Sequence, residues 1–432
     1  MEIIYRSLKL LVVLSLLLTV DVGSVGVWMS GVVHLVEIQV MSAKLLLSVN
    51  ESWRSIDPKS VLFFCLFLLL WGCKLPNKVS DNPMSVDIDA RHEVSIFDIF
   101  ERIELIPLET TDESIFRHVN RLRYHNGVLY ILDFRKIFAF DSTTGKFLFK
   151  IDDAGQGPQQ YLHINDFEID RQRNKILVLD PIARNLLEYD LNGRFVRRTR
   201  LPEIIHAYGS LRSLDDDVIV FQTFDPNNML KFYSRSQDSI FSEHFPVEES
   251  RRFNFGTGFL RSNSFIMRDL AFNNNLYEVF PDGTYSIAYT WDFGRLNNCI
   301  TKTRNFPERP RSQEEREEQN RRFRNSELVN YFFWLVGGNQ TYRYAQIIRR
   351  NQYIHLLHNI AEKRTHVFTE FSGGVSFYPV FWSDEFVIGL GPFAGYNEET
   401  IPDAILDERN LEIKRNICEF DNPVLIKYFF RR

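Results

Sequence analysis

The stretch Val128-Leu129-Tyr130-Ile131-Leu132-Asp133 is followed 47 residues later by a close copy, Lys175-Ile176-Leu177-Val178-Leu179-Asp180. Each copy leads into a second apolar run and then into a turn, Asp141 to Gly145 in the first case and Asp190 to Gly193 in the second. The aspartates of the two turns are 49 residues apart and the glycines 48. A period of this length, made of short β-rich runs and polar turns, is typical of the blades of a β-propeller.

The same pattern continues along the chain. We expect blades at residues 118–149, 162–201, about 205–246, 259–293 and 342–377, and a last one that combines 385–390 with 424–430. Ser312 and Glu315 have the spacing of a capping box, which predicts a helical insertion at about 310–325 with a solvated, mixed-charge surface. Without this insertion, the length after residue 95 corresponds to six blades of about 48 residues.

Closure of the ring is the next requirement, because an open propeller exposes strand edges on its first and last blades. The apolar run Val424–Phe430 ends the chain, and residues 96–108 mix apolar and charged residues in a way that suits a strand. We therefore predict an all-β, six-bladed propeller over residues 96–432, sealed by pairing between its terminal and N-terminal strands.

Composition supports strands and excludes one class of partner. The chain has 432 residues, of which 14% are aromatic, including 38 Phe, and such residues favour β-structure. Its 51 basic and 56 acidic residues are interspersed and give a formal charge of −5, so nucleic acid is not an expected partner.

The N-terminal region contains an apolar run at Val61–Leu70 that is too short to span a membrane but has the length of a signal-peptide core. It ends in Leu70-Trp71-Gly72-Cys73, which resembles the lipobox of bacterial lipoproteins, with Trp71 as a departure. An uncleaved anchor with a chance cysteine is the alternative. We expect residues 1–72 to be a signal segment with an upstream extension, and the natural start to be Met41.

Cleavage before Cys73 would make it the acylated first residue, and acyl chains attach a protein to a membrane without a spanning helix. Residues 73–95 are expected to be a flexible tether. Lys74 is not an acidic export tag, which favours the periplasmic side of the outer membrane. Of the other cysteines, Cys299 and Cys418 could either pair or remain free.

A family resemblance rests on four motifs in order. Gly155-Gln156-Gly157-Pro158-Gln159-Gln160-Tyr161 resembles the G-x-G-P-x-E-Y linker of the six-bladed β-propeller lipoproteins of Gram-negative bacteria, which are relatives of NHL-repeat propellers. The other three motifs lie at 277–283, Trp291–Gly294 and Asp421–Leu425. The resemblance implies an exported, membrane-tethered propeller whose biochemical activity is mostly undefined even for the family. Gln160 stands where the family has Glu, which puts a role for that carboxylate in doubt.

Candidate ligand-binding residues follow from the rule that propellers bind ligands at the channel mouth, on linkers and innermost strands. These residues are Gln156, Gln159, Tyr161, His163, Asn165 and Arg268. In the alternative reading, Gly155, Gly157 and Pro158 only shape a tight linker, Tyr161 packs between blades and Arg268 pairs with Asp269. Asp133 and Asp180 recur one blade apart and are expected to cap turns.

No catalytic or metal-binding motif is recognisable. Asp215, Asp216 and Asp217 are adjacent strand residues, so their side chains cannot all reach one ion. His355 and His358 are three apart, which is poor geometry for zinc on a strand. The chain lacks the serine-hydrolase elbow, the zinc-protease helix motif and a phosphate-binding glycine loop. We therefore expect no catalytic residue, cofactor or metal.

The sequence thus predicts a lipid-anchored propeller of the cell envelope that acts as a binding or scaffold module. Its partner would be a glycan, a peptide or another envelope protein. Two alternatives stay open: a hydrolase or lyase at the channel mouth, with calcium as a conceivable cofactor, and a structural subunit of an outer-membrane complex. Fold alone does not separate them.

Overall fold

The computed structural model describes residues 83–202, 208–223, 228–245, 259–261, 265–268, 274–297, 312–329, 332–391 and 401–431. The expectations about the signal segment, the start at Met41, lipidation of Cys73 and the first part of the tether fall on residues outside these ranges, as does Cys299. Cys418 is exposed and its thiol is free.

Six sheets make up the described part of the chain, and we call them blades 1 to 6. Blade 1 contains β3 (Arg121–His125), β4 (Val128–Asp133), β5 (Lys136–Asp141) and β6 (Phe147–Ile151). Blade 2 contains β7 (Asp166–Asp170), β8 (Lys175–Asp180), β9 (Asn185–Asp190) and β10 (Phe195–Arg200). Blade 3 contains β11 (Tyr208–Ser213), β12 (Val218–Thr223), β13 (Leu230–Ser234) and β14 (Ser239–His244).

The second half of the ring follows the same plan with two additions. Blade 4 contains β15 (Phe259–Arg261), β16 (Phe265–Arg268), β17 (Asn275–Val279) and β18 (Tyr285–Asp292), with β1 (Met84–Ser85) added in parallel to β18. Blade 5 contains β19 (Phe332–Gly338), β20 (Tyr342–Arg349), β21 (Gln352–Asn359) and β22 (Arg364–Phe368). Blade 6 contains β23 (Pro379–Trp382), β24 (Phe386–Leu390), β25 (Leu425–Phe430) and β2 (Phe100–Ile106).

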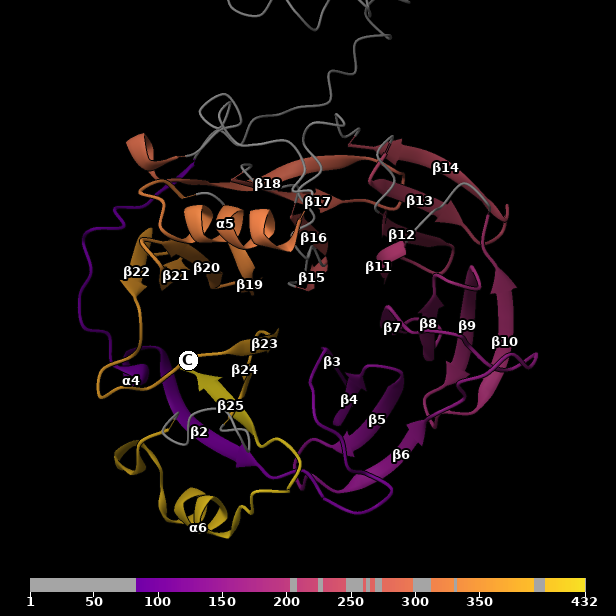
Figure 1. The fold of residues 1–432 in the computed structure, drawn as a ribbon, viewed down its shortest axis with the longest axis horizontal. Helices are drawn as coiled ribbons and strands as arrows, with labels where there is room; N and C mark the ends of the chain where they lie inside the picture. Colours follow the sequence, from indigo (N-terminus) through magenta and orange to yellow (C-terminus); the bar gives the residue numbers. More distant parts are fainter. Residues whose placement is uncertain are drawn as a thin grey trace, which may run out of the picture. The chain divides into compact units, whose positions relative to one another are not determined.

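The blades form a closed ring, because the first strand of each one contacts the first strand of the next, in the order β3, β7, β11, β15, β19, β23 and back to β3 (Figure 1). Closure within blade 6 joins the two ends of the ring. β2 pairs antiparallel with β25, from Phe100 opposite Phe430 to Ile106 opposite Leu425. The predictions of six blades and of closure between the terminal and N-terminal strands are therefore confirmed.

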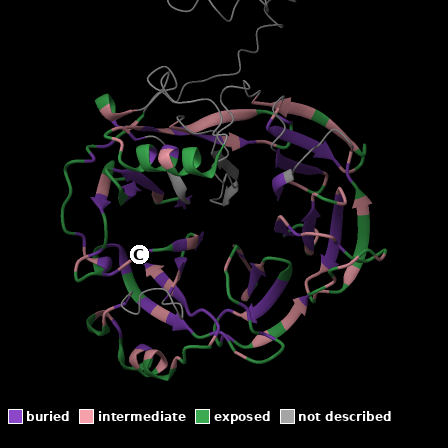
Figure 2. Ribbon diagram, in the orientation of Figure 1, coloured by how far each residue is buried: buried purple, intermediate pink, exposed green. Residues whose placement is uncertain are grey.

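The hydrophobic core is divided into six clusters, one between each pair of neighbouring blades. Figure 2 shows that the middle strands of the blades are largely buried. Between blades 1 and 2, for example, Tyr130 and Ile137 pack with Phe167 and Ile176. A middle strand is therefore covered on both faces. This explains why runs such as residues 128–133 are continuously apolar instead of alternating.

The repeated glycine turns have a packing role that the repeat alone did not reveal. Gly145 and Gly193 both have left-handed φ values, +71° and +78°. A Cβ on Gly145 would overlap with the carbonyl oxygen of Pro107, just after β2 of blade 6, and one on Gly193 would meet the Phe149 ring of blade 1. Each turn thus packs against the outer edge of the preceding blade, where only glycine fits.

Three α-helices lie in the described residues. α4 (Ile96–Ile99) is a single turn before β2, where we expected strand. α5 (Gln313–Arg324) confirms the predicted insertion, and the Ser312 hydroxyl accepts from the Glu315 N–H at 3.1 Å. α6 (Glu408–Asn416), between β24 and β25, was not predicted. None of the helices in the described ranges is long and apolar enough to cross a membrane.

Residues 84–95 correct the expected extent of the flexible tether. This segment, which we call the strap, begins as β1 on blade 4, crosses blade 5 and enters α4 on blade 6. Val86, Ile88 and Val94 of the strap are buried in the adjoining cores. The apolar residues at 86, 88 and 94 were the available signal for an ordered segment.

Candidate functional site

The innermost strand of blade 2 carries three acidic residues on one face. Asp166, Glu168 and Asp170 alternate along β7 with Phe167 and Ile169, which pack into the core toward blade 1. Because side chains of a strand alternate between its two faces, the three carboxylates share the other face. Each of these acidic residues is about 1% exposed, so they need partners inside the protein.

Arginines from the two neighbouring blades supply those partners. Arg123 of β3 lies 3.2 Å from both Asp166 and Glu168, and Arg121 lies 3.6 Å from Asp166. From the opposite side, Arg212 of β11 contacts Glu168. Burial lowers the pKa of Arg212 to about 10, while the Glu168 carboxylate acts in the opposite direction. These groups therefore join the inner strands of three blades.

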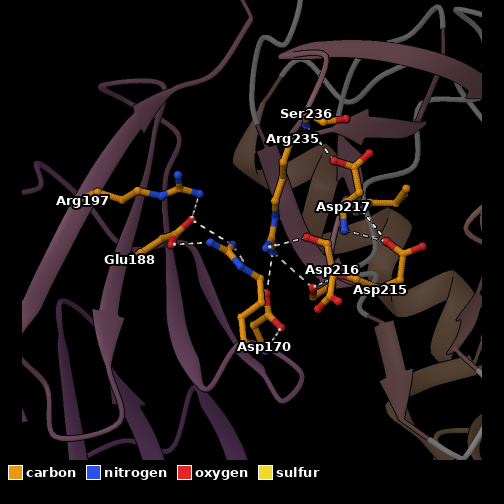
Figure 3. A network of polar contacts seen from close by, with 11 residues as sticks. Asp170, Glu188, Arg197, Asp215, Asp216, Asp217, Arg235 and Ser236 are labelled. Carbon is orange, nitrogen blue, oxygen red and sulfur yellow. Dashed lines mark hydrogen bonds and ion pairs between the residues drawn. The ribbon is translucent and has the colours of Figure 1, made fainter.

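A second set of ion pairs continues outward from β7 between blades 2 and 3 (Figure 3). Arg235 of blade 3 lies 2.7 Å from Asp170 and also donates to the carbonyl oxygen of Asp216 at 3.3 Å. Glu188 on β9 pairs with Arg173 at 3.3 Å and Arg197 at 2.7 Å. Arg235 therefore ties blade 3 to blade 2, whereas the two ion pairs of Glu188 lie within blade 2.

The three consecutive aspartates do not converge on a common point. Asp215 accepts from the backbone N–H groups of Asp217 and Val218, at 2.9 and 2.6 Å, and so caps its own turn. Asp217 instead accepts from Ser234 at 2.7 Å and from the Ser236 N–H at 2.7 Å, which lowers its pKa. The prediction that they cannot share one ion agrees with this geometry.

The linker from blade 1 to blade 2 is built around Tyr161. Its ring is fully buried between the two blades, and its hydroxyl donates to the Arg135 carbonyl oxygen at 2.7 Å. Burial raises the pKa of Tyr161 well above its usual value. Gln160 accepts from the Gly157 N–H at 2.7 Å, and its side chain fills the space beside Gly155. Tyr161 is thus a packing residue, not part of an exposed rim.

The other candidate ligand-binding residues are not brought together into one pocket. Gln156 and Gln159 are exposed, and His163 is half-buried. Asn165 donates from its side chain to the Gly209 carbonyl oxygen at 2.6 Å and so ties the linker to blade 3. The side chain of Arg268 and all of Asp269 lie outside what the structure describes. Only Gln156, Gln159 and His163 remain available at the surface.

Asp180 caps its turn as predicted, whereas in the equivalent turn of blade 1 the Phe134 N–H is bound by Asn120 at 2.8 Å instead of Asp133. Both aspartates hold linkers. Asp180 accepts from the N–H groups of Ile182 and Ala183 at 3.1 and 3.0 Å, and from Leu162 of the incoming linker at 2.7 Å. Asp133 accepts from the Arg117 N–H at 3.1 Å in the equivalent place of blade 1. The repeated carboxylate therefore fixes each linker to the turn beside it.

His355 and His358 have separate partners. His355 is buried, bonds to the Tyr344 hydroxyl at 2.7 Å and stacks on Phe368, and burial lowers its pKa to about 3. His358 bonds to the Thr365 hydroxyl at 2.9 Å. In the described part of the chain, no three His, Cys, Asp or Glu side chains converge as a ready metal site.

One end of the ring exposes a series of large apolar side chains. This end, the linker face, carries the linkers between blades and the turns that join second to third strands. Five such residues lie on it, with exposed fractions from 48% to 80%: Ile115, Phe134, Ile182, Tyr378 and Phe420. We call them the apolar arc. Because these exposed apolar side chains share one end of the ring, they are a candidate for an interaction surface.

Contacts between successive loops connect four members of the arc, Phe420, Ile115, Phe134 and Ile182, across blades 6, 1 and 2. Asn422, two residues after Phe420, accepts from the Phe116 N–H at 2.9 Å, next to Ile115. His118 meets the Phe134 ring edge-on at 4.8 Å between ring centroids. The turn that carries Phe134 is bonded to Tyr161, and the same linker is bonded to the turn of Ile182. Sequence reasoning missed the arc because single apolar residues in loops have no periodicity.

Comparisons with known proteins agree with this fold. The chain matches, over residues 82–429, the family described as "Domain of unknown function (DUF4934)". A crystal structure of a protein described as exported, from Bacteroides fragilis NCTC 9343, is similar with a TM-score of 0.65 at 16% identity, covering 81% of this chain and 99% of that one. A member of the DUF4221 family from Bacteroides vulgatus ATCC 8482 has a TM-score of 0.47 at 13% identity, with 79% and 99% covered. No curated protein matches the sequence.

Proposed function

This chain belongs to the DUF4934 family, and from that premise we propose that it is an interaction module of the cell envelope, with the linker face as its docking surface. The single observation that carries the proposal is the apolar arc. Monomeric proteins rarely expose large apolar patches, and where such a patch occurs it commonly marks a binding site for another protein.

The loops beneath the arc are held rigidly, which favours binding. Tyr161 and Asp180 each bind backbone groups of two different connections, and Asn422 binds three backbone groups of the linker between β2 and β3. The loops therefore do not need to be ordered by the partner. Pre-formed surfaces lose less conformational entropy on association than flexible ones.

The chemistry of the arc favours a polypeptide over a glycan. The three aromatic residues of the arc, Phe134, Tyr378 and Phe420, suit either a sugar ring or an apolar peptide side chain. The aliphatic Ile115 and Ile182 offer no ring face for a sugar and suit a peptide. Two exposed arginines lie near Phe134: Arg135 follows it in the chain, and the N–H of Arg117 is bonded to Asp133, which precedes it. We propose that the partner is a protein segment with an apolar anchor and neighbouring acidic residues, because this combination complements both features.

Attachment to the envelope is part of the same proposal. The lipobox-like residues 70–73 support export and acylation at Cys73, with the periplasmic side of the outer membrane as the expected location. The structurally similar Bacteroides fragilis protein is described as exported, which is consistent with this placement.

A peptide-display selection on the purified chain tests the docking surface. Enriched peptides should contain apolar and acidic residues and should bind a Phe134→Ser/Ile182→Ser variant at least about tenfold more weakly. The matched control is Leu148→Ser/Val196→Ser, which removes two apolar residues of similar exposure from the outer strands β6 and β10. Equal loss in both variants, or enrichment of glycans instead of peptides on an array, would contradict the proposal.

A further inference from the structure

Two histidines meet where the strap crosses blade 5. His92 of the strap and His366 of β22 face each other, with His92 Nε2 and His366 Nδ1 3.4 Å apart. They are separated by 274 residues in the chain, so only the path of the strap brings them together. Both side chains line a cavity of about 220 Å³ at this crossing.

The separation of the two nitrogens corresponds to a known coordination geometry. In a tetrahedral zinc site with Zn–N distances of about 2.0–2.1 Å, two imidazole nitrogens lie about 3.3–3.4 Å apart. The alternative is a single N–H···N hydrogen bond between two neutral rings, which is long at this distance.

The remaining lining of the cavity suits a cation. Three carboxylates, from Glu93, Asp98 and Glu362, and one guanidinium, from Arg364, line it together with the two imidazoles. Asp98 is engaged, since it accepts from the Ser95 N–H at 2.9 Å in the cap of α4. Glu93 and Glu362 are exposed, which leaves them free to turn toward a bound ion.

We propose that His92 and His366 form a binding site for a divalent transition metal, with zinc as the best-suited ion, which clamps the strap to blade 5. No third ligating side chain already converges with the pair in the described residues, so Glu93 or Glu362 completes the site together with water. Imidazole ligands select zinc, copper and nickel over calcium or magnesium. This site is independent of the docking surface proposed above.

The test uses the full-length, untagged chain in detergent, with all four cysteines replaced by serine as background because free thiols also bind zinc. Competition with a zinc-binding dye should show one site, and either His92→Gln or His366→Gln should weaken it at least about tenfold. His118→Gln is the control, because His118 is also exposed but lies beside Asp133 in blade 1 and does not line the cavity.

A second measurement locates the bound ion. Zinc should slow amide hydrogen exchange of residues 84–95 in the background protein and leave it unchanged in His92→Gln. Zinc binding that survives both histidine substitutions, or no effect of zinc on strap exchange, would overturn the proposal and leave an ordinary hydrogen bond between the two rings.

Discussion

Arg349, whose side chain is 2% exposed, donates from Nη1 to Asp89 Oδ1 at 2.6 Å, although the two residues are 260 positions apart. Arg349 belongs to β20 of blade 5 and Asp89 to the strap. The same guanidinium donates from Nε to the Glu327 carbonyl oxygen at 2.8 Å. One buried side chain thus ties the N-terminal strap and the segment after α5 to a single blade.

Replacing Arg349 should therefore loosen both segments. Arg349→Met keeps the apolar stem but leaves the Glu327 carbonyl without this donor, and we expect a loss of about 1–3 kcal/mol in the free energy of unfolding. Chemical denaturation measures it. Arg350→Met is the control, because Arg350 is exposed and pairs with Glu327 at the surface, and it should cause no measurable loss.

Alanine substitutions at Gly145 and at Gly127 distinguish the cost of backbone strain from the cost of steric overlap. Both have left-handed φ values, but a Cβ on Gly127 would meet nothing within 4 Å, whereas one on Gly145 would overlap with the Pro107 carbonyl oxygen. Gly127→Ala should cost about 1–2 kcal/mol, the price of the left-handed conformation. Gly145→Ala should lower the melting temperature clearly further, and equal effects would show that the turn does not pack on blade 6.

Glu168 and Arg212 should behave as an energetically coupled pair. Glu168→Leu removes the carboxylate that offsets the buried positive charge of Arg212. We expect a loss of about 3–5 kcal/mol in the free energy of unfolding. The double variant Glu168→Leu/Arg212→Leu should be more stable than the sum of the two single losses implies, by about 0.5–3 kcal/mol. A double-mutant cycle by denaturation decides this, and strict additivity would argue against the pair as the link between blades 2 and 3.

Because the imidazole of His355 is buried, we expect the protein to lose stability in acid. Burial lowers its pKa to about 3, below the ordinary value of 6.5, so the unfolded chain takes up a proton first as pH falls. The contribution of His355 to the free energy of unfolding is complete at pH values above the ordinary pKa. It declines between about pH 6 and 3, by up to about 1.4 kcal/mol per pH unit. His355→Gln should flatten the pH dependence of unfolding in this range, and an unchanged slope would assign it to other groups.

Cys73 should determine attachment to the membrane. Cys73→Ser removes the thiol that acylation requires, so the exported chain should no longer incorporate a labelled fatty acid and should leave the membrane fraction. Cys65→Ser is a matched control, since Cys65 lies within the apolar run and is not preceded by a lipobox-like sequence. Retention of Cys73→Ser in the membrane would favour an uncleaved anchor.

Several separate signals in the sequence predicted the architecture. The repeat at 128–195 indicated blades, the length after residue 95 indicated six of them, Ser312 and Glu315 indicated the helical insertion, and the apolar run Val424–Phe430 indicated the closing strand. Each of these follows from local patterns, because strand runs, turns and caps depend on neighbouring residues. The role of Asp180 as a turn-capping group followed from the same local chemistry, whereas the binding of the Phe134 N–H by Asn120 instead of Asp133 did not. For Tyr161, the sequence left open whether it faced a ligand or the core.

Only the tertiary structure decided which distant residues meet. The alternation of Asp166, Glu168 and Asp170 is visible in the sequence, but their arginine partners lie on other blades, 43 to 65 residues away. The path of the strap brings His92 to His366 and Asp89 to Arg349. The closure of the ring places the residues of the apolar arc on a common face. These contacts are set by how blades pack around the ring, which no local pattern encodes.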